Sequence, residues 1–325
     1  MRLVMMGTGH FAEPTFEALL QSPYSVVGLV TQPDRVVGAE RGSTRQTGRG
    51  MKAIAQEHGL PVLQPEKINT PEGVAALAEW RPDLLVVAAY GQILSRDVLA
   101  VPPLGGINVH ASLLPKYRGA APIAWAIYHG ETTTGVTIIR MTTGLDAGDM
   151  LAQESIELGA TETAGEAEAR LAQVGARLAV HVVSKLAAGE VQGRKQDLSL
   201  VTKAPKLTKE NGAIEWTRSA VQVCNHIRAM QPWPTAYTYW HRTGQPAIRL
   251  LVHTAVARAP QAGEAGNAGE VLLQLDLSRL RVMAGDGWVV EISELQPAGK
   301  RTMTAAEYLR GRKPQAGDRL GPEHA

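Results

Sequence analysis

The feature that most constrains the fold is a series of short, almost wholly apolar runs separated by segments with helical spacing. Such runs occupy residues 2–7, 25–31 and 83–89 of the 325-residue chain, and a further central strand is expected at 105–110. A strand that is apolar on both sides must be covered on both faces, and its alternation with helices is typical of a parallel sheet. The first part of the chain is therefore expected to be a doubly wound α/β domain.

The pattern changes after a long helical segment at 164–188. Residues 193–208 are polar and mixed, which predicts a linker. Beyond one more helix, turns at 242–244 and 285–287 separate apolar runs and indicate β-hairpins. We expect an α/β domain over 1–192, a linker over 193–208, and a smaller, mostly antiparallel β-barrel over 209–325.

Composition narrows the class of protein. Apolar residues make up 44% and charged residues 20% of the chain, as in ordinary globular proteins. The sequence has no apolar run near the roughly 20 residues of a membrane span, and no signal-peptide pattern. The single cysteine, Cys224, fits a reducing cytoplasm, and the histidines lack metal-ligand spacing. We expect a cytoplasmic protein without a membrane segment or a metal site.

The strongest chemical motif lies in the run INVHASLLPKYRGAAPI at 107–123. Asn108 and His110 are two residues apart on an expected strand, so both side chains point to the same side. Asp146 follows in the glycine-rich loop TGLDAGDM, one helix and one strand later. An amide, an imidazole and a carboxylate can together donate to an oxyanion and move a proton, which is what acyl transfer needs. The alternative is a structural pair that bonds to loop backbone.

A long loop over 35–52 carries a cluster of cations. It holds one acid, Glu40, among Arg35, Arg41, Arg45, Arg49 and Lys52. Loops of this length inside a compact domain are usually functional, and cations beside an active site can bind phosphates. The net charge is −2 over 1–205 and +4 over 206–325, which by itself favours a polyanionic partner only weakly. The alternative is a solvated insertion.

A second motif, Gly7, Gly9 and Ala12, matches the dinucleotide pattern G-x-G-x-x-A after the first strand. The acidic residue expected at the end of the second strand is not clearly present, because Asp34 comes late. We prefer the interpretation of a tight turn between a strand and a helix.

At these residues the chain resembles the formyltransferases that use 10-formyltetrahydrofolate. The resemblance covers nearly the whole sequence, from VVGLVTQPDR and VVAAYGQIL through INVHASLLPKYRGAAPI and GLDAGDM to IRAMQPWPTAY. It implies a Rossmann-like domain followed by an OB-like β-barrel, with Asn108, His110 and Asp146 as the catalytic residues. The RGAAPI run and the basic loop point to the branch of the family that formylates initiator Met-tRNA.

The same resemblance implies the binding residues. The folate co-substrate is expected to contact Tyr90, Gly91, Gln92, Ile93, Leu94, Ser112, Leu113, Leu114, Pro115 and Arg140. The tRNA is expected to contact Arg35, Arg41, Arg45, Arg49, Lys52, Lys206 and Lys209. A monomer is expected.

Three alternatives stay open at this point. The acceptor of the formyl group is a nucleotide-linked amino sugar in similar enzymes, and it is water in a formyltetrahydrofolate hydrolase. The third alternative is an RNA-binding protein on an inactive scaffold, against which the intact set of Asn108, His110 and Asp146 argues.

Overall fold

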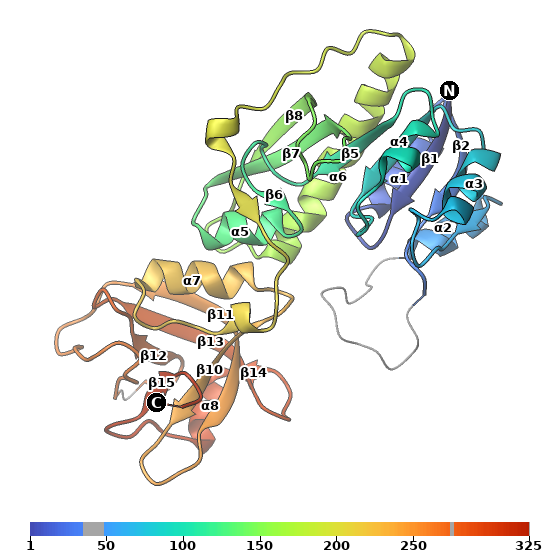
Figure 1. Cartoon of the computed structure of the whole chain (residues 1–325). Helices are drawn as coiled ribbons and strands as arrows, with labels where there is room; N and C mark the ends of the chain where they lie inside the picture. Colours follow the sequence, from blue (N-terminus) through green and yellow to red (C-terminus); the bar gives the residue numbers. More distant parts are fainter. Residues whose placement is uncertain (35–48, 274–275, 325) are drawn as a thin grey trace. The chain divides into compact units, whose positions relative to one another are not determined.

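The computed structural model describes residues 1–34, 49–273 and 276–324, in two compact units (Figure 1). The first unit comprises 1–123, 133–158 and 166–206, and the second comprises 124–132, 159–165 and 207–325. In the described ranges no helix has both the length and the apolar character needed to cross a bilayer.

The first unit is built on one seven-stranded sheet in the order β3-β2-β1-β4-β5-β7-β8. Its strands are β1 (Arg2–Gly7), β2 (Ser25–Val30), β3 (Val62–Leu63), β4 (Leu84–Ala88), β5 (Gly106–His110), β7 (Thr133–Arg140) and β8 (Met150–Glu157). The strands from β3 to β5 are parallel, whereas β7 and β8 run antiparallel to their neighbours. The expected mostly parallel α/β sheet is confirmed.

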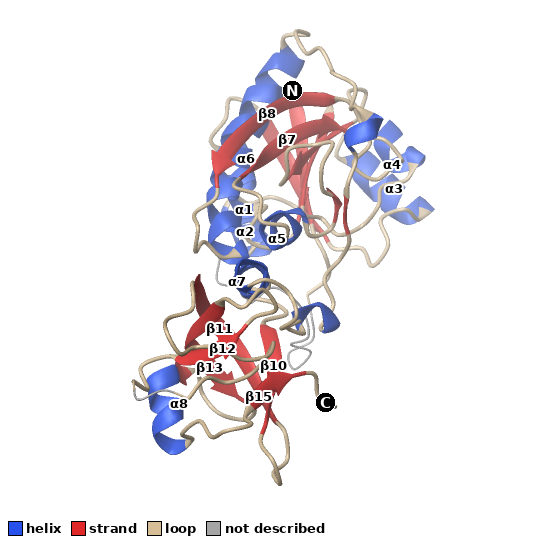
Figure 2. Cartoon of the chain, turned by 90° about the vertical axis from the view of Figure 1, so that its left-hand side faces the viewer, coloured by secondary structure: helices blue, strands red, loops and turns tan. Residues whose placement is uncertain are grey.

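Helices cover both faces of this sheet, as Figure 2 shows for α6 and α3. They are α1 (Glu13–Leu20), α2 (Met51–Glu57), α3 (Pro71–Glu79), α4 (Arg96–Ala100) and α6 (Ala164–Ala187). Side chains of α1, α2 and α6 pack with alternate strand residues such as Ile107 and Val109. Side chains of α3 and α4 pack with the opposite set, such as Leu85 and Val87. This alternation leaves every second residue of β5 facing the α3 and α4 side.

The glycines after β1 form a tight strand-to-helix turn, as preferred from the sequence. A Cβ on Gly7 would lie 2.7 Å from the Ala12 Cβ and 2.9 Å from the Ala88 carbonyl oxygen. Gly9 has a φ of +77°, a conformation that glycine adopts readily. Close packing of the helix on the sheet therefore explains the small residues of this motif.

Several short elements occur besides those of the main sheet and the barrel. They are β6 (Arg118–Gly119), α5 (Pro122–Tyr128), the 3-10 helices η1 (Leu198–Leu200) and η2 (Glu210–Gly212), and β9 (Lys203–Ala204). Strands β6 and β9 form a two-stranded parallel sheet.

The second unit is an antiparallel barrel. Its elements are α7 (Ala220–Ala229), β10 (Ala236–His241), β11 (Ile248–Arg258), β12 (Leu280–Met283), β13 (Val289–Pro297), β14 (Met303–Thr304), α8 (Ala305–Gly311) and β15 (Arg319–Gly321). The strand order is β12-β13-β11-β10-β15, and β14 pairs with β13. Bridges from Glu270 to Arg319 and from Val271 to Val282 join the two edge strands, which nearly closes the barrel. The expected small β-barrel is confirmed.

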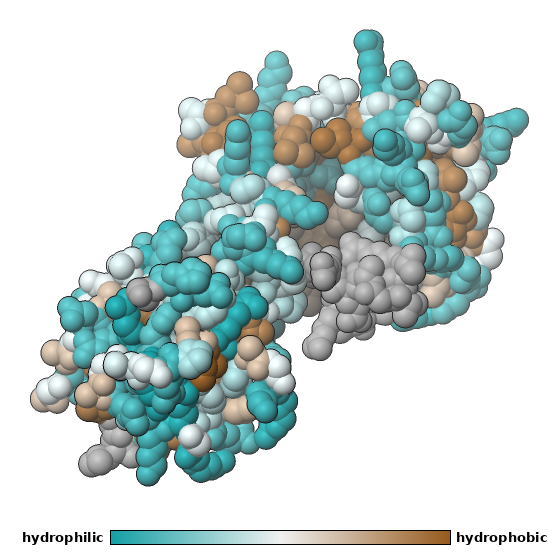
Figure 3. Space-filling view, turned by 60° about the horizontal axis from the view of Figure 1, so that its bottom comes forward, coloured by the Kyte–Doolittle hydropathy of each residue, from teal (hydrophilic) through white to brown (hydrophobic). Residues whose placement is uncertain are grey.

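The surface is that of an ordinary globular chain. Hydrophilic side chains cover most of the face shown in Figure 3, and apolar residues are scattered over it in small patches. Singly exposed apolar residues are normal on protein surfaces.

Candidate active site

Strand β5 presents two polar side chains on one face of the sheet. Ile107 and Val109 point into the core beside α6, so Asn108 and His110 face the opposite side. Asn108 is half-buried and pairs with Val87 of β4 and Ile139 of β7, while His110 is only 5% exposed. A buried polar pair on a central strand costs stability unless the groups are satisfied or used.

The loop between β7 and β8 brings Asp146 to this pair, as expected. The Asn108 Nδ2 lies 3.4 Å from the Asp146 Oδ1, and the His110 Nδ1 lies 3.6 Å from the Asp146 Oδ2. The backbone N–H of Gly119 donates to the Asp146 Oδ2 at 2.8 Å. Asp146 has a φ of +47°, which non-glycine residues adopt mainly where surrounding contacts hold them.

The contacts of His110 determine which ring nitrogen is available. Its Nε2 lies 2.9 Å from the Tyr117 carbonyl oxygen, which can only accept a hydrogen bond. The Nε2 therefore carries hydrogen, and the Nδ1 is the ring nitrogen that faces Asp146. Tyr117 itself has a φ of +61°, so the backbone turn that supplies this carbonyl is also uncommon.

The three side chains can together support acyl transfer. The Asn108 amide has two N–H donors, and one faces Asp146. The second can donate to an oxygen that gains negative charge, while the His110 Nδ1 and Asp146 handle a proton. Among the described residues, no group of three histidine, cysteine, aspartate or glutamate side chains is arranged to hold a metal ion.

One residue that sequence reasoning missed, Gln196, supports this centre. Gln196 donates through its Nε2 to the carbonyl oxygens of Asp146 at 2.7 Å and Gly148 at 2.8 Å. Its Oε1 accepts hydrogen bonds from Arg118. Gln196 lies in the segment expected to be a linker, where a lone glutamine among polar residues gives no signal of burial.

The loop expected to contact folate shows a mixture of roles. Tyr90 and Leu94 are buried in the core beside α3 and α4. The Gln92 amide bonds to the Ile68 N–H and to the Pro65 and Glu66 carbonyls. These side chains hold the loop in place through contacts inside the protein, and they do not extend from the loop into solvent. Gly91 is exposed and has a φ of +83°.

The exposed apolar side chains of this loop and of the Asp146 loop are suited to contact with the ring of a folate. Ile93 is 68% exposed, and Leu145 on the Asp146 loop is 60% exposed. The Tyr90 hydroxyl is buried without a hydrogen-bond partner in the described part of the chain, and burial raises the pKa of Tyr90 to about 12. Two exposed aliphatic side chains, one of them next to Asp146 in the chain, are consistent with apolar contact to a folate ring.

The remaining residues expected to contact folate are mostly engaged internally. The buried Ser112 hydroxyl donates to the Lys116 carbonyl, and the guanidinium of Arg140 donates to the Leu104 carbonyl. Leu114 is buried and precedes a cis peptide bond to Pro115. Leu113 and Pro115 are half-buried, so these two are the better placed to line a site.

The cations expected to bind tRNA differ in their surroundings. Arg35, Arg41 and Arg45 lie outside the described residues. Arg49 pairs with Glu57 and Glu17, and Lys52 pairs with Asp34. Lys206 and Lys209 are exposed. The Arg49 and Lys52 pairs are surface ion pairs, with the Arg49 side chain 58% and the Lys52 side chain 40% exposed, and Lys52 lies in α2 rather than in a loop.

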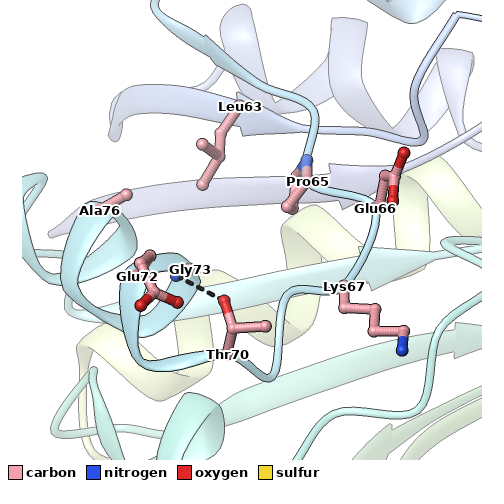
Figure 4. Close-up of a pocket in the computed structure, with 8 residues that line it drawn as sticks. All are labelled: Leu63, Pro65, Glu66, Lys67, Thr70, Glu72, Gly73 and Ala76. Atoms are coloured by element: carbon pink, nitrogen blue, oxygen red, sulfur yellow. Dashed lines mark hydrogen bonds between the residues drawn. The ribbon is translucent and has the colours of Figure 1, made fainter.

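A separate pocket of about 540 Å³ lies between β3 and α3 (Figure 4). It is lined by Leu63, Pro65, Glu66, Lys67, Thr70, Glu72, Gly73 and Ala76. The Thr70 hydroxyl accepts a hydrogen bond from the Gly73 N–H and so caps α3. None of its lining residues belongs to the Asn108 cluster, so the chemistry proposed for that cluster does not involve this pocket.

Comparison with known proteins identifies the family. The family model described as formyl transferase matches residues 1–183, and that described as formyl transferase, C-terminal domain, matches residues 206–313. A methionyl-tRNA formyltransferase of Geobacter sulfurreducens is 43% identical over 99% of this chain and 97% of its own length. One of Citrifermentans bemidjiense is 43% identical over 100% and 98%. The chain belongs to the methionyl-tRNA formyltransferase family.

Solved structures show how widely the fold of this formyltransferase is shared. The N-formyltransferase of Helicobacter canadensis, solved with folinic acid and dTDP-3-aminofucose, has a TM-score of 0.65 at 15% identity over 89% of this chain and 98% of its own. HypX of Aquifex aeolicus, solved with tetrahydrofolic acid, has a TM-score of 0.57 at 17% identity over 95% of this chain and 46% of its own. At these identities the likeness concerns the fold alone.

Proposed function

We propose that this chain transfers the formyl group of 10-formyltetrahydrofolate to the α-amine of methionine carried by initiator tRNA. The observation that carries the proposal is the convergence of Asn108, His110 and Asp146 on one face of β5. The family to which the chain belongs provides the chemical class of the reaction. The product would be formylmethionyl-tRNA for translation initiation.

Asn108 supplies the electrostatic part of catalysis. Its second amide N–H donates to the oxygen on which negative charge develops during acyl transfer. The donor is fixed before the reaction, because the strand holds the side chain and Asp146 occupies the first N–H. Loss of one such donor typically lowers kcat on the order of 10²–10³-fold.

His110 and Asp146 carry out the proton transfer. The attacking amine must lose a proton, and the leaving nitrogen must gain one. The His110 Nδ1 is the available ring nitrogen, because the Tyr117 carbonyl holds hydrogen on the Nε2. Asp146 faces that Nδ1 and orients the ring. Positioned acid–base groups of this kind contribute about 10²–10⁴-fold to rate.

The loops at 89–94 and 140–146, with Leu113 and Pro115, hold the folate in this proposal. When bound, 10-formyltetrahydrofolate supplies the formyl group. The exposed side chains of Ile93 and Leu145 offer apolar contact to a ring, and loop backbone around Gly91 offers polar contact. Binding by these groups brings donor and acceptor together, which can supply several of the roughly 7–11 kcal/mol available from proximity.

The tRNA contacts are the cations of the basic loop together with Lys206 and Lys209. Lys206 and Lys209 are exposed and follow directly on the segment that contacts Asp146. Phosphate contacts make binding salt-dependent, with a slope that grows with their number. The division into a domain over 1–192, a linker over 193–208 and a tRNA-binding barrel over 209–325 belongs to the same proposal, as do a monomeric state and a cytoplasmic location.

The decisive experiment offers labelled 10-formyltetrahydrofolate with three acceptors in parallel: initiator Met-tRNA, uncharged initiator tRNA and a nucleotide-linked amino sugar. The proposal predicts label on Met-tRNA alone, with a rate that falls steeply as salt rises. Label on the sugar would replace the tRNA substrate with a sugar. Release of formate without any acceptor would indicate a hydrolase. The Asn108→Ala variant is the control for enzyme-dependent transfer.

A further inference from the structure

The segment at 194–204, here called the strap, crosses both loops that form the catalytic centre. Its Arg194 exchanges two backbone hydrogen bonds with Met150, at 2.8 and 2.9 Å, just after the Asp146 loop. At its other end, the Thr202 carbonyl accepts from the Arg118 N–H at 2.9 Å, and the Thr202 hydroxyl accepts from the Tyr117 N–H at 2.8 Å. The strap therefore touches the loops that supply the Asp146 carboxylate and the Tyr117 carbonyl.

Gln196 is the one side chain in the middle of the strap that turns inward. It is 9% exposed, whereas its neighbours Lys195 and Asp197 are exposed. Its two N–H groups are both used, one on the Asp146 carbonyl and one on the Gly148 carbonyl. Its Oε1 is shared by the Nε and Nη2 of Arg118, at 3.1 and 2.7 Å. One amide thus connects the Asp146 loop to β6.

The same two elements also meet at the carboxylate. The Gly119 N–H, next to Arg118, donates to the Asp146 Oδ2. Gln196 therefore acts on the catalytic carboxyl from two directions, through the backbone of Asp146 and through the strand that carries the Gly119 donor. The left-handed backbone of Asp146 is a conformation that aspartate tolerates, and these contacts fix the position of the carboxylate within it.

We propose that Gln196 is a positioning residue for formyl transfer, which holds the Asp146 carboxylate beside the His110 Nδ1. The proposal rests on the proposed function for its activity readout. Gln196 is not expected to touch either substrate. Its removal should let the Asp146 loop move, and a displacement of about 1 Å at a catalytic group can lower the rate about 10²-fold.

The test uses two substitutions with different consequences and one matched control. Gln196→Ala removes all four contacts. Gln196→Glu keeps an acceptor for Arg118 but loses both donors to the Asp146 and Gly148 carbonyls. We expect both variants to lower kcat about 10²-fold at saturating substrates, with unchanged KM for folate and Met-tRNA. Gln192→Ala, at an exposed glutamine nearby, should match wild type. Wild-type kcat in Gln196→Glu would overturn the assigned contact.

A double-mutant cycle separates positioning from a general effect on the fold. If Gln196 acts through Asp146, then Gln196→Ala should change kcat less than about 2-fold in the Asp146→Ala background. An equal loss in both backgrounds would overturn the proposal.

Hydrogen exchange over 142–149 gives a readout that does not depend on activity. Gln196→Ala should speed exchange there while exchange in α6 stays as in wild type. Unchanged exchange over 142–149 would overturn the proposal even if the wild-type enzyme proved to use another acceptor. Failure of the wild type to formylate Met-tRNA would instead overturn the proposed function.

Discussion

Replacing Asn108 by alanine or by aspartate should separate the two roles of its amide. Asn108→Ala removes the donor to the reacting oxygen and should lower kcat about 10²–10³-fold. Asn108→Asp removes the same donor and also places a carboxylate 3.4 Å from the Asp146 Oδ1. The two variants should therefore share the loss of activity but differ in stability.

The expected difference in stability between the two variants follows from the distance between the side chains of residues 108 and 146. Two unit charges 3.4 Å apart repel by about 5 kcal/mol at the effective dielectric constant of about 20 that suits such sites. The alternative, protonating a carboxyl whose ordinary pKa is about 3.9, costs about 5.6 kcal/mol at pH 8 and about 2 kcal/mol at pH 5.5. The folded pair binds a proton more tightly than the unfolded chain does, so Asn108→Asp regains stability as the pH falls.

The assay is thermal unfolding of both variants at pH 8 and pH 5.5. For a domain of this size, 1 kcal/mol shifts Tm by about 2–4 °C, so Asn108→Asp should melt about 10–20 °C below Asn108→Ala at pH 8. The gap should shrink to about 4–8 °C at pH 5.5. Equal Tm values at pH 8, or a gap that does not depend on pH, would refute the close approach of the two side chains.

Three further predictions concern the surrounding structure. Gly148→Ala should lower kcat about 10²-fold, because the new Cβ would lie 1.7 Å from the Arg140 carbonyl oxygen and displace the Asp146 loop; steady-state kinetics measure this. Asn69→Ala should raise the KM for folate with little change in kcat, because Asn69 donates to the Ile93 carbonyl at 2.8 Å; an unchanged KM would contradict it. Burial lowers the pKa of His226, so stability should fall as the pH drops below about 6.5; between pH 7.5 and pH 5.5, Tm should fall less in His226→Gln than in wild type.

The buried strands of the α/β sheet could be predicted, because the apolar pattern of each strand can be read from its own short segment of sequence. The strands β1 and β4 are apolar on both sides, and only a covered sheet accommodates that pattern. The same two-residue period predicted that Asn108 and His110 share a face. Strand β8 was not predicted, because only some of its residues are buried and its exposed glutamates resemble a loop. Helix α8 was also missed, although Thr304 and Glu307 form a capping box that is legible in the sequence.

The details of the site depend on contacts between distant segments, and these leave no local pattern. Gln92 and Arg140 were both expected to contact folate. In the structure the Gln92 amide bonds to the loop before α3, and the Arg140 guanidinium donates to the Leu104 carbonyl. Gln196 lies 50 residues from Asp146 in a stretch without periodicity. Such side chains can be assigned only when the structure shows which carbonyl and amide groups they meet.

In the proposed reaction, Asp146 and its partners perform the chemical step. The most direct measurement is single-turnover formyl transfer to initiator Met-tRNA by wild type and by Asp146→Ala, with both substrates saturating. We expect a chemical step at least about 10²-fold slower in the variant, with folate and tRNA affinity unchanged. A variant that transfers formyl at the wild-type rate would contradict it.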